Sequence, residues 1–163
     1  MVPQHRPEPW MCMPLAFATV LEIPVADLLT EIGHDGSKIV FPNLPEPACR
    51  QGFHIQELIH VALRRGLAVT PVELYPVSGS ADARQTQTIL YPDGNANRFA
   101  AVLASSRGVI DGTGLRFGHM VAYDHGRIID PKGHEYGYSR IACEAHQFYT
   151  RCAWRLDAIG VRE

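Results

Sequence analysis

The segment from Leu15 to Leu21 constrains the fold more than any other part of the chain. Apart from Thr19, every residue in this segment is apolar, so in a helix the apolar side chains would cover nearly all faces. A helix of this kind has to be buried. Pro14 can open it, because a proline in the first turn has no N–H group that would need a partner. The sequence therefore predicts a buried helix that starts at Pro14, with Cys12 just ahead of its N-terminus.

Two further helices are expected in the first 66 residues. Pro24 begins a short one, which carries apolar residues as far as Ile32 and ends at Gly33. A third is predicted from Ile55 to Arg65, with apolar residues on one face and Gly66 after its end. Residues 34–53 are rich in proline and glycine and predict an irregular loop.

The rest of the chain predicts mainly strands. Residues 67–75 and 152–161 are expected to be strands, and residues 99–104 form a short apolar run in the same half. Residues 76–98 leave helix and strand both open. The clearest local signal is a β-hairpin, formed by residues 119–123 and 127–130 around an Asp-His-Gly turn and ended by Pro131.

This order of elements predicts one α+β domain over residues 1–163, with a helical half at 1–66 and a β half at 67–163. A chain of 163 residues is long enough to bury a core of its own. Hydrophobic residues make up 46% and charged residues 20%, which is typical of a soluble globular protein.

Charge and hydropathy exclude several classes of protein. Fifteen basic and seventeen acidic residues give a net charge of −2, so we expect no nucleic-acid partner. The longest apolar run, residues 11–21, is shorter than the roughly 20 residues that span a membrane. Several prolines in and before this run argue against a signal peptide, and we expect a cytoplasmic protein.

The four cysteines do not indicate a disulfide framework or a zinc site. None belongs to a C-x-x-C pair. Cys49 with His54, and Cys143 with His146 and Cys152, are the closest clusters, and neither has the spacing of a structural zinc site. We therefore expect a reducing compartment and neither metal nor cofactor.

Cys12 is the first residue that could carry chemistry. At a helix N-terminus the partial positive charge and the free N–H groups favour a thiolate, which is the nucleophilic form of cysteine. Taken alone, a cysteine in this position is more often a buried residue that only packs.

His119 and Asp130 supply what a cysteine nucleophile needs. His119 opens the first strand of the hairpin, and Asp130 closes the second. If the turn lies at residues 124–127, the two side chains come close diagonally across the ladder, at about 7–8 Å between backbone positions. A carboxylate at this distance can fix the tautomer and orientation of an imidazole. Each residue alone has a simpler explanation, but the three together predict a Cys-His-Asp triad.

These residues resemble the papain-like cysteine peptidases, and among them the compact C39-like branch found in bacteria and phages. That branch has the order Gln, Cys, His, Asp, with C-G-P-A-A opening the helix and G-H-ϕ-V leading to I-D-P. This chain has Cys12-Met-Pro-Leu-Ala16, Gly118-His-Met-Val121 and Ile128-Ile-Asp-Pro131. The resemblance follows the order of elements along the whole chain. It implies a papain-like fold with Cys12 as nucleophile, His119 as general base and acid, and Asp130 as orienting group.

Two positions depart from the pattern of this branch. Its oxyanion-hole glutamine usually lies about six residues before the cysteine, whereas Gln4 lies eight before Cys12. The prolines between them could loop out the difference, so Gln4 is the expected oxyanion-hole residue. Met13 stands where glycine is usual and would crowd the approach to the thiolate.

Three residues are expected to contact the substrate: Met13, Trp10 and Gly118. Trp10, two residues before the nucleophile, could line a subsite or could pack over the start of the helix. Gly118 leaves space beside the imidazole for a substrate backbone.

The resemblance implies a thiol hydrolase that cleaves a peptide or isopeptide bond in a peptide or protein through a thioester. Three other hypotheses stay open. The chain could be a binding module with the same fold and an impaired triad, or a transglutaminase-type transferase or deamidase with the same triad. The third hypothesis is a metal-binding protein that uses the surplus histidines.

Overall fold

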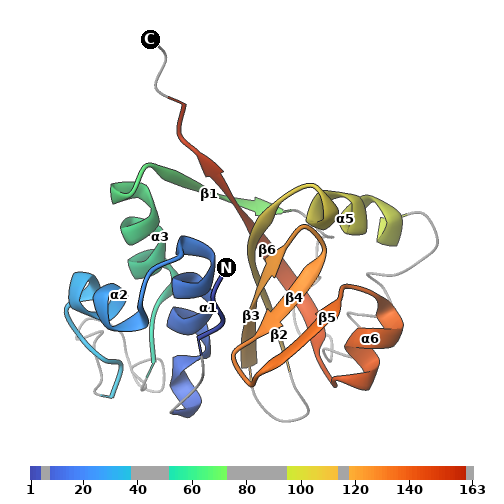
Figure 1. Cartoon of the computed structure of the whole chain (residues 1–163), viewed down its shortest axis with the longest axis horizontal. Coiled ribbons are helices and arrows are strands. Elements are labelled where there is room, and N and C mark those ends of the chain that lie inside the picture. Colours follow the sequence, from blue (N-terminus) through green and yellow to red (C-terminus); the bar gives the residue numbers. More distant parts are fainter. Residues whose placement is uncertain (5–7, 38–51, 73–94, 114–117, 161–163) are drawn as a thin grey trace, which may run out of the picture.

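An antiparallel sheet with helices on both faces forms the frame of the molecule (Figure 1). The computed structural model describes residues 1–4, 8–37, 52–72, 95–113 and 118–160. Within these ranges the chain has the predicted α+β architecture: N-terminal helices, with Cys12 at a helix start, followed by a six-stranded antiparallel sheet.

Three α-helices lie in the described part of the N-terminal half. A single 3-10 turn, η1 (Pro9–Met11), leads into α1 (Cys12–Leu21), which is followed by α2 (Val25–Ile32) and α3 (Ile55–Arg64). The α1 helix starts at Cys12, two residues earlier than predicted, because the 3-10 turn already brings the backbone into a helical conformation. Gly33 ends α2 in the left-handed conformation that glycine adopts without a Cβ clash, as its position predicts.

Six strands form the sheet, in the order β1-β6-β2-β3-β4-β5, and each pairs antiparallel with its neighbours. They are β1 (Leu67–Val72), β2 (Arg107–Thr113), β3 (Gly118–Asp124), β4 (Arg127–Asp130), β5 (His134–Gly137) and β6 (Tyr149–Ala158). β1 lies at one edge, and an edge strand is where a proline such as Pro71 is tolerated within a sheet. The expected hairpin is confirmed, since β3 and β4 pair with Asp124 opposite Arg127.

Both faces of the sheet are buried, and its strands alternate between two hydrophobic clusters. On β3, Met120 and Ala122 belong to the cluster that also contains α1. Val121 and Tyr123 belong to the cluster on the other face. The all-round apolar character of α1 agrees with its position, since residues 14–20 of this helix are all buried.

The second face is covered by two helices, α5 (Asn95–Ala104) and α6 (Arg140–Ala145). The sequence predicts mainly strands in this half and shows only a short apolar run at 99–104. It gives no sign of α6. Alanine is the strongest helix former, and the run 99–104 contains three alanines without the alternation of a strand. The described part of the β half therefore contains two helices, which pack on the sheet through Leu103 and Cys143.

A β-bulge interrupts the pairing of β2 with β6. Asp111 lies opposite Cys152, whereas the next residue, Gly112, lies opposite Thr150. Arg151 is therefore an extra residue on β6. Bulges of this kind redirect side chains and are common beside active sites.

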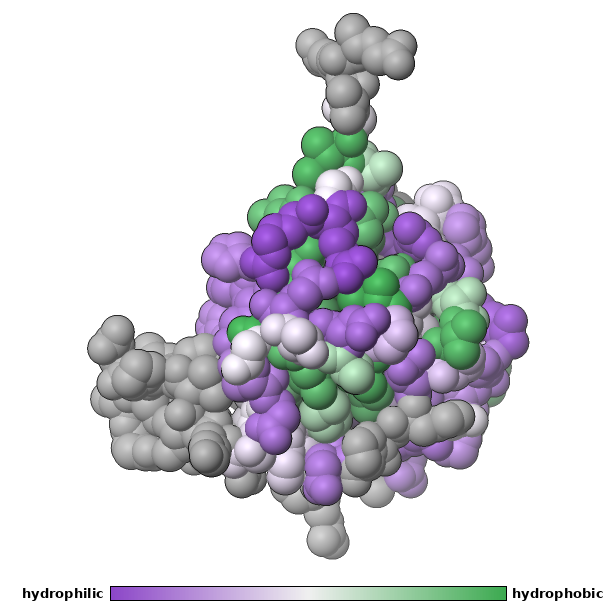
Figure 2. Space-filling model, turned by 60° about the vertical axis from the view of Figure 1, so that its left-hand side comes forward, coloured by the Kyte–Doolittle hydropathy of each residue, from purple (hydrophilic) through white to green (hydrophobic). Residues whose placement is uncertain are grey.

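The helical side of the molecule has no continuous apolar face in Figure 2, where hydrophobic surface appears as separate patches between hydrophilic residues. Across the described residues, no single helix is long and apolar enough to cross a membrane. Only α1 and α2 taken together meet the length and hydropathy requirement, and they are bent by 110° relative to each other.

Candidate active site

Cys12 is the first residue of α1 and is half-buried against the core cluster on the α1 face of the sheet. The N-cap residue, Met11, makes no side-chain capping hydrogen bond, and the first turn of α1 contains no acidic residue. The partial positive charge of the terminus therefore acts on the Cys12 thiol without a competing acidic cap. Cys12 is not part of a disulfide.

His119 and Asp130 are joined by a hydrogen bond, as the hairpin register predicts. The distance from His119 Nε2 to Asp130 Oδ1 is 2.8 Å, and both residues are only 4% exposed. The backbone N–H of Lys132 donates to the same oxygen, also at 2.8 Å. Asp130 is thus held from two sides at the end of β4.

The protonation of this pair follows from its contacts. Burial raises the pKa of Asp130, but the hydrogen bond and charge of His119 and the N–H of Lys132 outweigh it and lower the pKa overall. An ionised Asp130 can only accept, so the proton of the hydrogen bond lies on Nε2. This leaves Nδ1 as the ring nitrogen that can exchange a proton with a third group.

Cys12 is that third group. Its side chain is hydrogen-bonded to the imidazole of His119. Burial lowers the pKa of His119, but the hydrogen bonds to Asp130 and Cys12 and the negative charge on both partners raise it overall. The structure therefore brings together the three predicted triad residues, which lie on α1, β3 and the end of β4.

Phe148 is a contact of the site that the sequence analysis missed. Its ring packs edge-on against the imidazole of His119, with 5.9 Å between ring centroids and an interplanar angle of 87°. Phe148 is 1% exposed and precedes β6. No spacing in the sequence connects Phe148 with His119. The contact between Lys132 and Asp130 could have been predicted, because aspartate tends to accept from the backbone N–H two residues on.

Gln4 is not brought to Cys12. It lines a surface pocket of about 530 Å³ with Met1, Val2 and residues 22–24, which directly follow α1. A ten-residue helix is about 15 Å long, and Cys12 lies at its other end. The expected place of Gln4 in an oxyanion hole therefore finds no support in its position, and we assign it no role.

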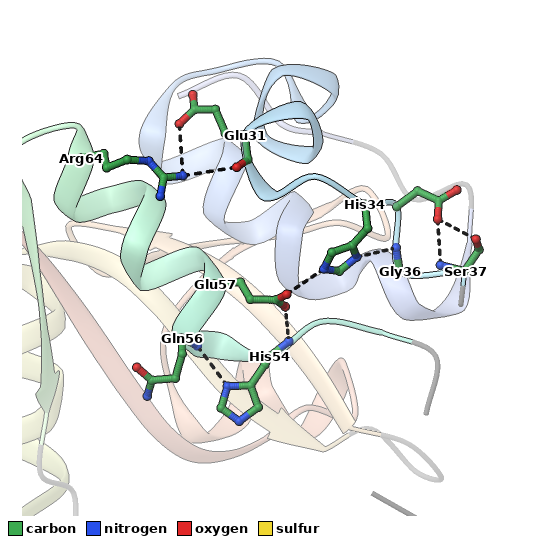
Figure 3. Close-up of polar contacts among 9 residues, drawn as sticks. Glu31, His34, Gly36, Ser37, His54, Gln56, Glu57 and Arg64 are labelled. Atoms are coloured by element: carbon green, nitrogen blue, oxygen red, sulfur yellow. Dashed lines mark hydrogen bonds and ion pairs between the residues drawn. The ribbon is translucent and has the colours of Figure 1, made fainter. Parts of the chain in front are cut away.

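Trp10 is anchored to the segment that follows α2. Its Nε1 donates to the carbonyl oxygen of Asp35 at 3.3 Å. This segment belongs to the polar network in Figure 3, in which His34 contacts Glu57 of α3 at 2.7 Å between Nε2 and Oε1. The indole is half-buried and holds the chain just before Cys12, so its expected contact with substrate stays a prediction.

Met13 and Gly118 differ in their surroundings. Met13 is half-buried and packs against the same core cluster as Cys12. Gly118 is exposed, and a Cβ at this position would lie 3.9 Å from Nη2 of Arg151. The predicted open space beside His119 thus ends at a guanidinium group.

The remaining described cysteines are poor nucleophiles. Burial raises the pKa of Cys143 to about 12. Burial and the neighbouring Asp111 raise that of Cys152 to about 12 as well. Within the described ranges, no three His, Cys, Asp or Glu side chains are grouped so that they could hold a metal ion. Cys49 lies outside these ranges.

Comparison with known proteins adds no assignment, since neither a family model nor a curated protein sequence matches the chain. The arrangement of Cys12, His119 and Asp130 is therefore the basis for inferring a function.

Proposed function

We propose that this chain is a cysteine peptidase or related amide hydrolase with a papain-like fold. Cys12 is the nucleophile, His119 the general base and acid, and Asp130 the group that orients the imidazole. The substrate is a peptide or isopeptide bond in a peptide or protein, and the reaction passes through a thioester.

The observation that carries this proposal is the shared imidazole. His119 Nε2 lies 2.8 Å from Asp130 Oδ1, and the same ring is hydrogen-bonded to Cys12 at the start of α1. A nucleophile, a base and an orienting carboxylate in this order are the requirements of triad catalysis. The papain-like assignment is supported by helices that precede an antiparallel sheet, with the cysteine at a helix start and the histidine on a strand.

In the first half of the reaction, the Cys12 thiolate attacks the carbonyl carbon of the scissile amide and forms a C–S bond. The C–N bond then breaks, and the proton on Nδ1 of His119 goes to the departing amine. The raised pKa of His119 favours this step, because it keeps the ring protonated when a donor is needed.

In the second half, water attacks the thioester and His119 Nδ1 takes a proton from that water. The C–S bond breaks, the acid product leaves and Cys12 returns to the thiolate. Asp130 keeps its negative charge throughout and stabilises the imidazolium.

The charge on the tetrahedral intermediate needs N–H donors. The backbone N–H of Cys12 is the donor we assign to it. A missing second donor typically costs about 10²–10³ in rate, so a site without a glutamine partner would be slow but still active.

A mixture of tryptic peptides from a bacterial proteome tests the proposal, with wild type and Cys12→Ala incubated in parallel. Mass spectrometry then reads each change in the mixture. We expect new peptide termini with wild type and none with Cys12→Ala. If the two proteins give the same termini, hydrolysis by Cys12 is excluded.

The same spectra separate the alternative activities. Conversion of glutamine to glutamate would indicate a deamidase, and new isopeptide links between peptides would indicate a transferase. A protein that changes no peptide while its Cys12 is unreactive would be a binding module, and the proposal would be wrong.

A further inference from the structure

Arg151 occupies an unusual position in the sheet that carries His119. It is the extra residue of the β-bulge, between Thr150 and Cys152, which pair with Gly112 and Asp111 of β2. Gly112 also pairs with His119 of β3. The bulge is therefore level with His119 in the sheet, two strands away from β3, and it displaces a cationic side chain from the regular alternation of β6.

The guanidinium of Arg151 is held by Asp111. The distance from Nη2 to Asp111 Oδ2 is 2.6 Å. The Asp111 side chain is 20% exposed, whereas that of Arg151 is 47% exposed. A guanidinium has five N–H donors, and this contact engages one of its nitrogens. Asp111 thus fixes the position of the group while about half of the arginine side chain stays open to solvent.

The same nitrogen lies beside Gly118. A Cβ on Gly118 would lie 3.9 Å from Nη2, so the side chain starts on β6, passes β2 and reaches β3. Asp111 is two residues from Val109, and Gly118 is two residues from Met120. Because side chains alternate along a strand, both positions are on the face that packs against α1 and Cys12, whereas His119 is two residues from Val121 and its ring contacts Phe148 of the other cluster.

These contacts place a guanidinium, held in an ion pair with Asp111, beside the residue that precedes the histidine, on the sheet face that packs against α1. We propose that Arg151 is a specificity-determining residue that binds a carboxylate of the substrate next to the reacting bond. This inference rests on the proposed function. A guanidinium binds a carboxylate through paired N–H donors, and Gly118 leaves the approach free of a side chain.

The carboxylate can belong to an acidic side chain or to the C-terminus of a peptide. Peptidyl Michael acceptors extended on both sides of the electrophilic carbon distinguish these sources. One series carries glutamate or glutamine at each of two positions on either side, and a second carries a free or an amidated C-terminus. The measured quantity is the rate constant kinact/KI for alkylation of Cys12.

We expect at least one carboxylate probe to react about tenfold or more faster than its neutral counterpart, which is typical of a charge-assisted hydrogen bond. This preference, the ratio of the two kinact/KI values, should fall to about one in Arg151→Gln. In wild type it should decrease with added salt. Arg151→Lys keeps the charge without the paired donors and should retain part of the preference for carboxylate probes. Because the preference is a ratio within one protein, a general loss of activity does not change it.

Arg155→Gln is the matched control. Arg155 is on the same strand, is 43% exposed and also contacts an aspartate, with 2.7 Å between Nε and Asp157 Oδ2. This variant should keep the full preference.

Two results would overturn the inference. If Cys12 reacts equally with charged and neutral probes, or if Arg151→Gln keeps the preference, the carboxylate site is wrong while the thiol chemistry stands. If Cys12 reacts with no probe and with no small alkylating agent, the proposed function itself fails, and the carboxylate site fails with it.

Discussion

The imidazole of His119 lies between two groups that both favour its protonated form. Asp130 accepts from Nε2, and Cys12 interacts with the same ring. Burial acts in the opposite direction, because a charged ring in a 4% exposed position loses its hydration. The raised pKa of His119 shows that the two partners outweigh burial.

Asp130→Ala should move the alkaline limit of amide hydrolysis to lower pH. Hydrolysis needs a protonated His119 to release the amine, so activity falls as pH rises through the pKa of this residue. Without Asp130, burial still lowers that pKa and only Cys12 raises it. The pH profile of kcat/KM on a cleaved peptide measures the shift.

Asp124→Ala is the control for this prediction. Asp124 contacts a histidine of the same hairpin, with 2.6 Å between its Oδ1 and Nδ1 of His125, but both side chains are well exposed. Its pH profile should match that of wild type. An Asp130→Ala profile with an unchanged alkaline limit would show that Asp130 does not set the protonation of His119.

At the scale of elements, β2 approaches β6 closely where Gly108 pairs with Arg155. Gly108 of β2 permits this approach. A Cβ at this position would lie 1.9 Å from the carbonyl oxygen of Trp154 and 2.9 Å from the ring of Tyr123. Neither neighbour can move far, since one is backbone of the adjacent strand and the other is a fully buried ring.

Gly108→Ala should therefore lower the free energy of unfolding by about 2–3 kcal/mol, the upper part of the range for an overpacked core. Urea unfolding followed by circular dichroism measures the change. Gly137→Ala on β5 is the control, because no atom lies within 4 Å of its Cβ position. Its effect should stay within about 0.5 kcal/mol, and equal effects of the two variants would contradict the close approach.

At the scale of the whole molecule, the site exists only where the two halves meet. Cys12 comes from the helical half, whereas His119 and Asp130 come from the hairpin more than a hundred residues later. The α1 helix packs on β3, and this packing brings Cys12 to the histidine. Phe148 adds a contact from the chain just before β6.

Features with a strong local signal could be predicted from the sequence. The apolar character of residues 15–21 indicated a buried helix, and the Asp-His-Gly turn fixed the hairpin register that joins His119 to Asp130. Gly33 indicated the end of α2, because glycine readily adopts the positive φ that this position has. In each case a few neighbouring residues determine the conformation.

Features that depend on distant contacts could not be predicted. The bulge at Arg151 depends on how β6 pairs with β2, and nothing near residue 151 specifies that pairing. Gln4 lies near residues 22–24, beyond the C-terminal end of α1, and this position also depends on tertiary packing. Its spacing from Cys12 suggested a place near the N-terminal end. The helix at 95–104 was missed because a short apolar run carries no clear period.

The most direct test of the account is the rate of iodoacetamide labelling against pH, with the modified cysteine identified by mass spectrometry. Wild type and His119→Ala are compared. Cys143 and Cys152, each with a pKa of about 12, are internal references. We predict that Cys12 of wild type reacts well below pH 8, that His119→Ala loses this reactivity at low pH, and that urea abolishes the difference. If Cys12 labels no faster than the references, or labels alike in both proteins, the site is not a thiolate–imidazole pair and the proposed chemistry is wrong.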